Sequence, residues 1–196
     1  MMSYFLITAG LGIIVSFIGM KLRPKFGMRN ILMVTTSIQI IGGLVFYFLS
    51  LSSRDNIYTF IGFLWITFFG AFHTGFFQTM QGLSMDEDEL KTGIRRENSF
   101  LGINALITKP ADSFGPMLAI WILEITKYVK DSAIDVQPDT AVVGMKSILI
   151  LLPVIFAAIS LLFMYFYPLH GKVMEKLYAD INKMHEEKRA QLSKSE

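Results

Sequence analysis

The sequence of 196 residues contains no cysteine, which excludes disulfide bonds, thiolate metal sites and cysteine nucleophiles. Charged side chains are also scarce, at 17% of the residues against 53% that are hydrophobic. They form short clusters between long uncharged stretches, and the net charge of +2 is an average over these clusters. It therefore gives no reason to expect nucleic acid as a partner. This composition excludes an ordinary soluble domain.

Five stretches carry almost no charge and are long enough to cross a bilayer, which takes about 20 apolar residues in a helix. The apolar runs are continuous rather than alternating, which favours helices over the strands of a transmembrane barrel. The first stretch has no basic residue before it, so we interpret it as a retained span and not as a cleaved signal peptide. The sequence therefore predicts an all-α, multi-pass membrane protein whose transmembrane domain covers residues 1–168. The predicted spans are 3–20, 30–51, 57–81, 98–124 and 146–167.

Basic residues lie mainly on one side of this predicted domain. Thirteen of the 18 Lys and Arg residues fall within 21–29, 86–97 and the tail 169–196, against four on the opposite side. Because cytoplasmic loops are enriched in basic residues, we expect these three segments in the cytoplasm and the N-terminus outside the cell membrane. An outside N-terminus followed by an odd number of spans is typical of a chain that lacks an upstream helix. We therefore expect a fragment of a larger protein.

The tail is charged, but it repeats apolar residues at spacings of four, four and three: Val173, Leu177, Ile181 and Met184. This pattern predicts a helix with one narrow apolar stripe. We expect the stripe to lie against the membrane or the cytoplasmic loops, and a solvated, frayed tail is the alternative.

Lys109 and Asp112 are the only charged residues between residues 98 and 123. A charge at the centre of a membrane helix costs roughly 2.5–3.5 kcal/mol on insertion scales, so this pair needs a compensating role. The two share a helical face with four small or short residues: Gly102, Ala105, Pro116 and Ala119. Such a seam suits close helix packing or a water-filled cavity. We predict that the pair lies in a transport pathway, while a mutually neutralised pair at a packed interface is the alternative.

Pro110 follows the charged Lys109 directly. Proline removes a backbone donor and biases the preceding residue away from helical geometry, so a kink or partial unwinding is expected there.

Two other predicted spans present polar faces. Thr74 and Gln78 follow Thr67 and Gly70 at helical spacing in the third span, and Gln39 follows Thr35 in the second. We predict that Thr74, Gln78 and Gln39 line the pathway of solute and cation, although helix packing explains such residues equally well. For His73, a hydrogen-bonded packing role is favoured over a proton relay.

The sequence lacks the common motifs of soluble enzymes and metal sites. The sequence has no P-loop spacing, no H-E-x-x-H, no G-x-S-x-G and no haem-type histidine pairing. The acidic run 86–89 lacks the order of an EF-hand loop and is interpreted as the solvated N-terminus of a helix. We expect no enzyme activity, no cofactor and no metal centre.

Residues 82–104, GLSMDEDELKTGIRRENSFLGIN, carry the pattern acid-x-x-Thr-Gly-x-Arg-x-Glu after an aspartate. The matching residues are Asp86, Glu89, Thr92, Gly93, Arg95 and Glu97. The segment resembles the cytoplasmic loop before the eleventh helix of the glycoside–pentoside–hexuronide:cation symporters, a branch of the major facilitator superfamily. Leu83 stands where this family usually has a further aspartate, and Glu87 where it has an aromatic residue.

Three further segments resemble the same family in the same order. GMKLRPKFGMRN is similar to the short interhelical motif of the superfamily, although Pro24 stands where many members have aspartate. QPDTAVVGMKSI resembles the external loop before the last helix, and YPLHGKVMEKL the start of the tail. The motif residues in the first of these segments are Gly19, Lys25, Gly27 and Arg29.

The resemblance implies that the five spans are helices eight to twelve of a twelve-helix transporter, an incomplete C-terminal half of a major-facilitator-type bundle. It implies a sugar-like solute, Na⁺ or H⁺ as coupling cation, and the missing N-terminal half as a partner. It also places a functional lysine at Lys109. Arg95 with Asp86 or Glu89 is then expected to act as a cytoplasmic latch that stabilises the outward-facing state. We expect the chain to be inactive alone.

The alternative function is a non-transporting membrane scaffold or a half-module that binds a partner. A membrane-embedded enzyme is disfavoured, because Lys109 and Asp112 lack a convincing nucleophile or metal-ligand partner in the sequence.

Overall fold

The computed structural model describes residues 10, 14–15, 17–19, 21–22, 25–52, 56–130, 133, 136–168 and 171–195. Most of the predicted span 3–20 lies outside the described residues. Within them the secondary structure is helical and contains no strand. The helices are α2 (Met28–Leu51), α3 (Ile57–Thr92), α4 (Glu97–Ile125), α5 (Asp139–Lys146), the π-helix η2 (Ser147–Leu151), α6 (Leu152–Tyr165) and α7 (Gly171–Ser195). The chain has the all-α fold that the sequence predicts.

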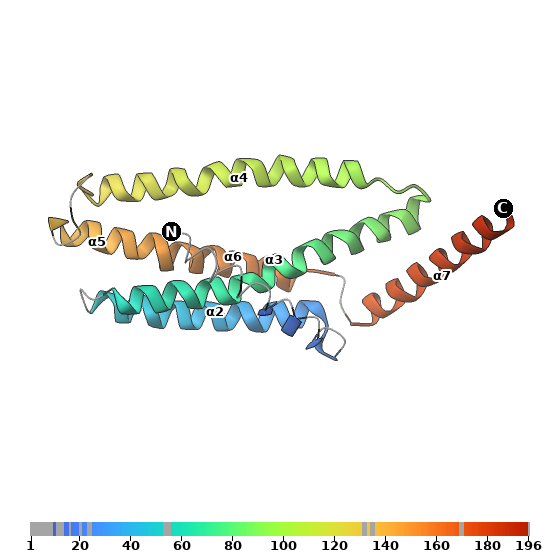
Figure 1. Ribbon diagram of the computed structural model, residues 1–196, viewed down its shortest axis with the longest axis horizontal. Coiled ribbons are helices and arrows are strands. Elements are labelled where there is room, and N and C mark those ends of the chain that lie inside the picture. Colours follow the sequence, from blue (N-terminus) through green and yellow to red (C-terminus); the bar gives the residue numbers. More distant parts are fainter. Residues whose placement is uncertain are drawn as a thin grey trace.

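Three long apolar helices form the packed body of the molecule. By length and composition Met28–Leu51, Ile57–Thr92 and Asp139–Tyr165 can each cross a membrane, the last being α5, η2 and α6 in succession. Helix α2 packs against both α3 and α6, and the three run side by side in Figure 1. They correspond to the predicted spans 30–51, 57–81 and 146–167. The predicted span 98–124 corresponds to α4, which is not among these three.

Glycines let α2 approach its neighbours closely. A Cβ atom added at Gly42 would lie 2.2 Å from the indole nitrogen of Trp65, and one added at Gly43 would lie 2.5 Å from Val154. The indole nitrogen of Trp65 also donates a hydrogen bond to the carbonyl oxygen of Ile38 over 3.2 Å. Small residues permit such backbone approach in membrane helices.

The π-helical turn η2 precedes Pro153, which lies in the first turn of α6. Proline has no N–H to donate, and its ring collides with the carbonyl group four residues earlier in a regular helix. The wider π-helical turn separates these groups, and Leu152 instead donates its N–H to the carbonyl oxygen of Ser147. Proline thus shifts the hydrogen-bond register of this helix without ending it.

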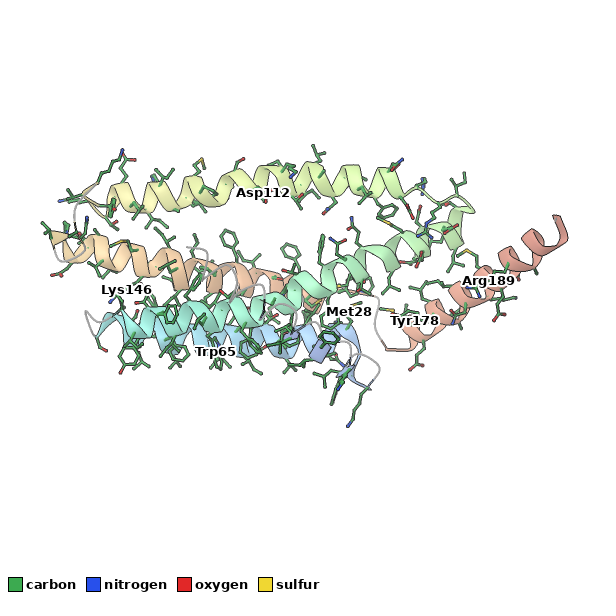
Figure 2. The ribbon with its side chains drawn as sticks, in the orientation of Figure 1. Met28, Trp65, Asp112, Lys146, Tyr178 and Arg189 are labelled. Carbon is green, nitrogen blue, oxygen red and sulfur yellow. The ribbon has the colours of Figure 1, made fainter. Side chains whose placement is uncertain are left out.

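The tail helix α7, which carries Tyr178 in Figure 2, packs against the C-terminal part of α3. Leu177 and Ile181 are buried in the same hydrophobic cluster as Leu83 of α3 and Met28 of α2. Met184 is half-buried and Val173 is exposed. The centre of the stripe thus packs against other helices of this chain; the cytoplasmic position of the tail stays a prediction.

Helix α4 runs alongside the packed body and has no buried residue (Figure 1). Its main contacts are with α5, next to its own C-terminal end. The helix is continuous through Pro110 and Pro116, so the expected partial unwinding at Lys109 is wrong. A proline costs one hydrogen bond, and an uncrowded helix can absorb its ring by bending rather than by opening a turn.

Candidate functional site

Lys109 and Asp112 form an ion pair on α4, with 3.7 Å between the lysine Nζ and the aspartate Oδ2. Their side chains are 79% and 70% exposed. In water such an exposed pair contributes about 0–1 kcal/mol. In a bilayer the same exposure is costly unless protein or water covers the pair. The geometry therefore suits a charged pair that faces an aqueous cavity or another protein surface.

Most of the predicted seam of small residues is not on the half-buried face of α4, and Ala119 is its one half-buried member. Gly102, Ala105 and Pro116 are exposed on the same side as Lys109. The half-buried positions follow a neighbouring face and are Asn104, Thr108, Gly115, Leu118, Ala119, Ile122, Leu123 and Thr126. The charged face is thus left open in this chain.

The predicted pathway residues on α2 and α3 are not brought together. Gln39 is buried between the two helices, where its Nε2 donates to the carbonyl oxygen of Ile66 over 3.3 Å. Thr74 and Gln78 are exposed on α3. His73 lies at the α2–α3 contact, with its Nε2 3.0 Å from the hydroxyl oxygen of Thr36, which agrees with the packing role expected for it. A pathway role for Gln39, Thr74 and Gln78 stays a prediction.

Arg95 is the centre of an ion-pair cluster at the C-terminal end of α3. One of its terminal nitrogens lies 3.1 Å from Asp86 and 2.9 Å from Glu89, and its Nε bonds to Glu97. Glu89 is only 4% exposed, whereas Arg95 is 43% exposed. Because Asp86 and Glu89 belong to α3 and Glu97 to α4, Arg95 ties the end of one helix to the start of the next.

The turn that carries Arg95 is built by the other two predicted loop residues. Gly93 ends α3 in the left-handed conformation with φ 72°, and its N–H bonds to the carbonyl oxygen of Glu89 over 2.8 Å. Thr92 donates its hydroxyl to the carbonyl oxygen of Asp88 over 2.8 Å. A left-handed glycine is a common helix end, since it lacks a Cβ that would clash. All six residues of the predicted loop motif thus meet in one structure.

The acidic run 86–89 lies in the last turns of α3, so its interpretation as a helix N-terminus is wrong. The helix dipole disfavours carboxylates at a C-terminal end. Arginine side chains from the following turn compensate, as Arg96 bonds to Asp88 in addition to the contacts of Arg95. The hydrogen bonds that Arg95 donates to Glu97 and Glu89 raise its pKa, and the hydrogen bonds that Arg96 donates to Asp88 raise the pKa of Arg96. Both guanidinium groups are permanently charged.

The interhelical motif also forms specific contacts. Gly27 precedes α2 with φ 73°, and a Cβ at Gly19 would lie 2.9 Å from the ring of Phe76. Lys25 lies with its Nζ 5.4 Å from the ring centre of Phe26. Arg29 bonds to the last turn of α6 through the carbonyl oxygen of Met164 at 3.1 Å. The motif therefore approaches α3 through Gly19, which lies before α2, and joins α2 to α6 through Arg29.

Lys146 is a functional candidate that sequence reasoning counted only as an external basic residue. It is buried, and its Nζ donates to the carbonyl oxygen of Ser50 in the last turn of α2. Its position at the start of a 23-residue uncharged stretch, 147–169, is the signal in the sequence that singles it out.

Long apolar helices and charges placed at their ends and on one open face define a multi-pass, all-α membrane protein. The family described as MFS/sugar transport protein matches residues 1–171, and the chain belongs to this family. Neither the search of curated proteins nor that of solved structures found a match. The family supports a transporter-type function, with a small-molecule solute and the lipid bilayer as partners.

Proposed function

We propose that the chain is the C-terminal part of a glycoside–pentoside–hexuronide:cation symporter, which moves a sugar-like solute with Na⁺ or H⁺ by alternating access. The observation that carries this proposal is the convergence of Asp86, Glu89 and Glu97 on Arg95. These are residues of the loop that resembles this branch of transporters, and their contacts join α3 to α4.

The mechanism that follows is a rocking of two helical halves about a central site. Lys109 would donate hydrogen bonds to the solute or hold a carboxylate of the other half, and Asp112 would balance its charge between these states. The open face of α4 supports this role, because neither side chain is covered within the described residues. The outward-facing or the inward-facing conformation would then be favoured according to which of them binds the solute and the cation more tightly.

Arg95 would act as a latch on the cytoplasmic side. It fixes the angle between α3 and α4 through charge-assisted bonds, which are about twice as strong as neutral ones. Releasing these bonds would free α4, and with it Lys109, to change orientation. The latch therefore supports a mechanical link between the inner loop and the proposed solute site.

The test is uptake of a panel of labelled glycosides by vesicles that contain the complete gene product, with and without Na⁺ and with a pH gradient. We expect Na⁺- or H⁺-dependent accumulation of at least one glycoside, and a loss of at least tenfold in Lys109→Ala. The matched control is Lys127→Ala, because Lys127 is an exposed lysine in the turn after α4. Normal accumulation by Lys109→Ala would remove Lys109 from the site.

A non-transporting scaffold is the second candidate, and one observation favours it. Helix α4 has 29 residues and buries none of them, so it presents a long surface to a partner. Failure of every glycoside to accumulate under both gradients, with the protein correctly inserted, would support this candidate over the symporter.

A further inference from the structure

A cavity of about 380 Å³ lies between the start of α3 and the continuous helix α5–η2, at the end of the molecule opposite to Arg95. This volume lies within the range of about 300–1,000 Å³ that is typical of small-molecule sites. Asn56 to Phe63 on α3 span about 10 Å at the helical rise of about 1.5 Å per residue. The cavity therefore occupies the first two turns of a membrane-spanning helix, where headgroups and the first acyl carbons of a bilayer lie.

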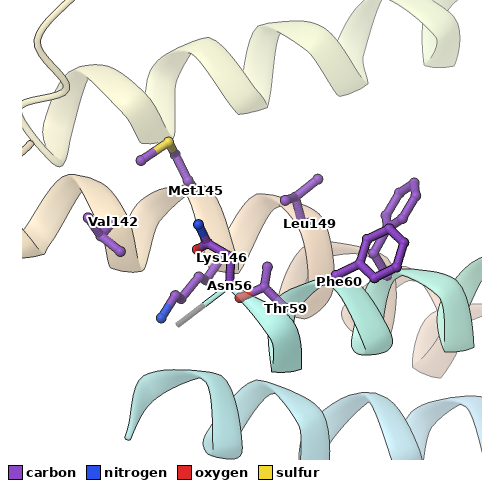
Figure 3. Close-up of a pocket in the computed structure, with 8 residues that line it drawn as sticks. Asn56, Thr59, Phe60, Val142, Met145, Lys146 and Leu149 are labelled. Carbon is purple, nitrogen blue, oxygen red and sulfur yellow. The ribbon is translucent and has the colours of Figure 1, made fainter. Parts of the chain in front are cut away.

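The wall of the cavity has an apolar part and a polar part. The apolar part consists of Phe60, Phe63, Val142, Met145 and Leu149. The polar part consists of Asn56, Thr59 and Lys146, and Figure 3 shows these three side chains close together. Each of the three carries a hydrogen-bond donor, and none of the eight lining residues is acidic. This arrangement matches a ligand with an apolar body and a polar end rich in acceptors.

Thr59 provides an independent sign that the cavity can bind a ligand. Its side chain is 7% exposed, and its hydroxyl oxygen has no hydrogen-bond partner within the part of the chain that the structure describes. A buried polar group without a partner costs about 1–3 kcal/mol, and such a group in a native structure calls for an explanation. An acceptor at the polar end of the cavity would provide the partner.

The π-helical turn η2, which accommodates Pro153, borders the cavity. Leu149 lies within η2, and Lys146 precedes it directly. The π-helical turn thus contains Leu149 of the apolar wall and directly follows Lys146 of the polar part.

We propose that this cavity binds one phospholipid of the bilayer. An acyl chain would lie against Phe60, Phe63 and Leu149, and the phosphate and ester oxygens would accept hydrogen bonds at Asn56 and Thr59 beside the positive charge of Lys146. Basic pockets between membrane helices bind phospholipid headgroups in this way. A free sugar fits less well, because most of the wall offers it no hydrogen-bond partner. The proposal is independent of the transport function proposed above.

The test counts phospholipids retained by the purified full chain in native mass spectrometry, after reconstitution with palmitoyl-oleoyl-phosphatidylglycerol or palmitoyl-oleoyl-phosphatidylcholine. We expect one retained phospholipid per chain, of either headgroup, since both carry the phosphate. Leu149→Trp should fill the cavity and lower the retained fraction at least tenfold. Thr59→Val keeps the shape of the side chain but removes the hydroxyl, and should lower retention about fivefold, the effect of one net hydrogen bond.

Ile155→Trp is the matched control. Ile155 lies on the same continuous helix as Leu149, and the two residues are similarly exposed, at 48% and 42%. Ile155 does not line the cavity. Both tryptophan variants replace exposed side chains, and circular dichroism should confirm that their helix content is unchanged. Equal retention by Leu149→Trp and Ile155→Trp would overturn the proposal. Displacement of the phospholipid by a soluble glycoside would also overturn it, and would assign the cavity to a solute.

Discussion

The guanidinium group of Arg29, in the first turn of α2, donates a hydrogen bond to the carbonyl oxygen of Tyr165 over 2.6 Å. Tyr165 is the last residue of α6, whose final carbonyl groups have no partner within the helix. At the other end of the same helix pair, Lys146 donates to the carbonyl oxygen of Ser50 in the last turn of α2. Lys146 belongs to α5, which continues through η2 into α6. The C-terminal ends of α2 and of this continuous helix are thus each capped by a cation from the other.

Replacing Arg29 should destabilise the α2–α6 pair. Arg29→Ala removes two charge-assisted hydrogen bonds, and we expect a loss of about 1.5–3 kcal/mol in the free energy of unfolding. Arg29→Lys keeps the favourable charge at the helix end but loses the fork that reaches two carbonyl groups, so it should lose roughly half as much. Denaturant unfolding of the purified chain in detergent measures both. Lys25→Ala is the control, and an equal loss there would contradict a specific cap.

Replacing Lys146 should act at the opposite end. Lys146→Met keeps an unbranched apolar stem but leaves the buried Ser50 carbonyl without this donor, for an expected loss of about 1 kcal/mol. Ser50 lies 21 residues along α2 from Arg29, which is about 30 Å. Because sites this far apart usually act independently, the double variant with Arg29→Ala should show the sum of the two losses within about 0.5 kcal/mol. A coupling above about 1 kcal/mol would mean that the two caps do not act separately.

Neutralising Arg95 should shift the balance between outward-facing and inward-facing states of the complete transporter. Arg95→Gln removes the positive charge that holds Asp86 and Glu89. We expect the cytoplasmic side of α3 in the complete transporter to become more accessible. In a complete transporter whose other cysteines, if any, are replaced, a single cysteine in place of the exposed Gln78 can report on access by its rate of labelling; the present chain contributes no cysteine of its own. We expect that rate, measured from the cytoplasmic side, to rise severalfold.

Arg96→Gln is the matched control for the latch, because Arg96 is the adjacent arginine and bonds to Asp88 within the same acidic run. It should change the labelling rate much less, since the ion pair of Arg96 with Asp88 does not include Glu97 of α4. Equal rates in the two variants would show that only the net charge of the loop matters.

The two interpretations of Lys109 and Asp112 differ in a double-variant experiment. If the two residues only neutralise each other at a packed interface, Lys109→Met leaves an unpaired carboxylate. The single variant should then show lower uptake than the double variant with Asp112→Leu. If Lys109 contacts the solute, uptake should be lost in the single and the double variant alike, at least tenfold. Uptake in vesicles, together with the amount of inserted protein, separates these outcomes.

Charge and hydropathy were enough to predict the helices, because a membrane helix is defined by a long uncharged run with charges at its ends. The residues of the loop motif meet at the turn between α3 and α4, since they are close in sequence, and their role as a gating loop stays a prediction. The acidic run 86–89 was misassigned because sequence alone does not show that α3 continues to Thr92, past the apolar run that ends near residue 81.

The remaining features depend on contacts between distant residues. Arg29 and Met164 are 135 residues apart, and Lys146 and Ser50 are 96 apart. No local spacing encodes which carbonyl group a cation will reach, so these caps were not predicted. The small residues of α4 are visible in the sequence. Which face of the helix packs against other helices depends on its neighbours in space, and the sequence of α4 does not show them. The cavity next to η2 lies between two segments that are distant in the sequence, 56–63 and 142–149, and has no sequence signature.

Docking of the tail helix gives a last prediction, because it rests on two side chains of the apolar stripe. Leu177 and Ile181 are buried against the C-terminal part of α3, while Val173 of the same stripe is exposed. Replacing a buried Leu or Ile by Ala costs about 2–5 kcal/mol, and the narrow contact between α7 and α3 offers little else to offset it. Leu177→Ala with Ile181→Ala should therefore release the tail and speed its cleavage by trypsin at least tenfold. Val173→Ala should leave the cleavage rate unchanged, and rapid cleavage of the unaltered chain would show that α7 is not docked.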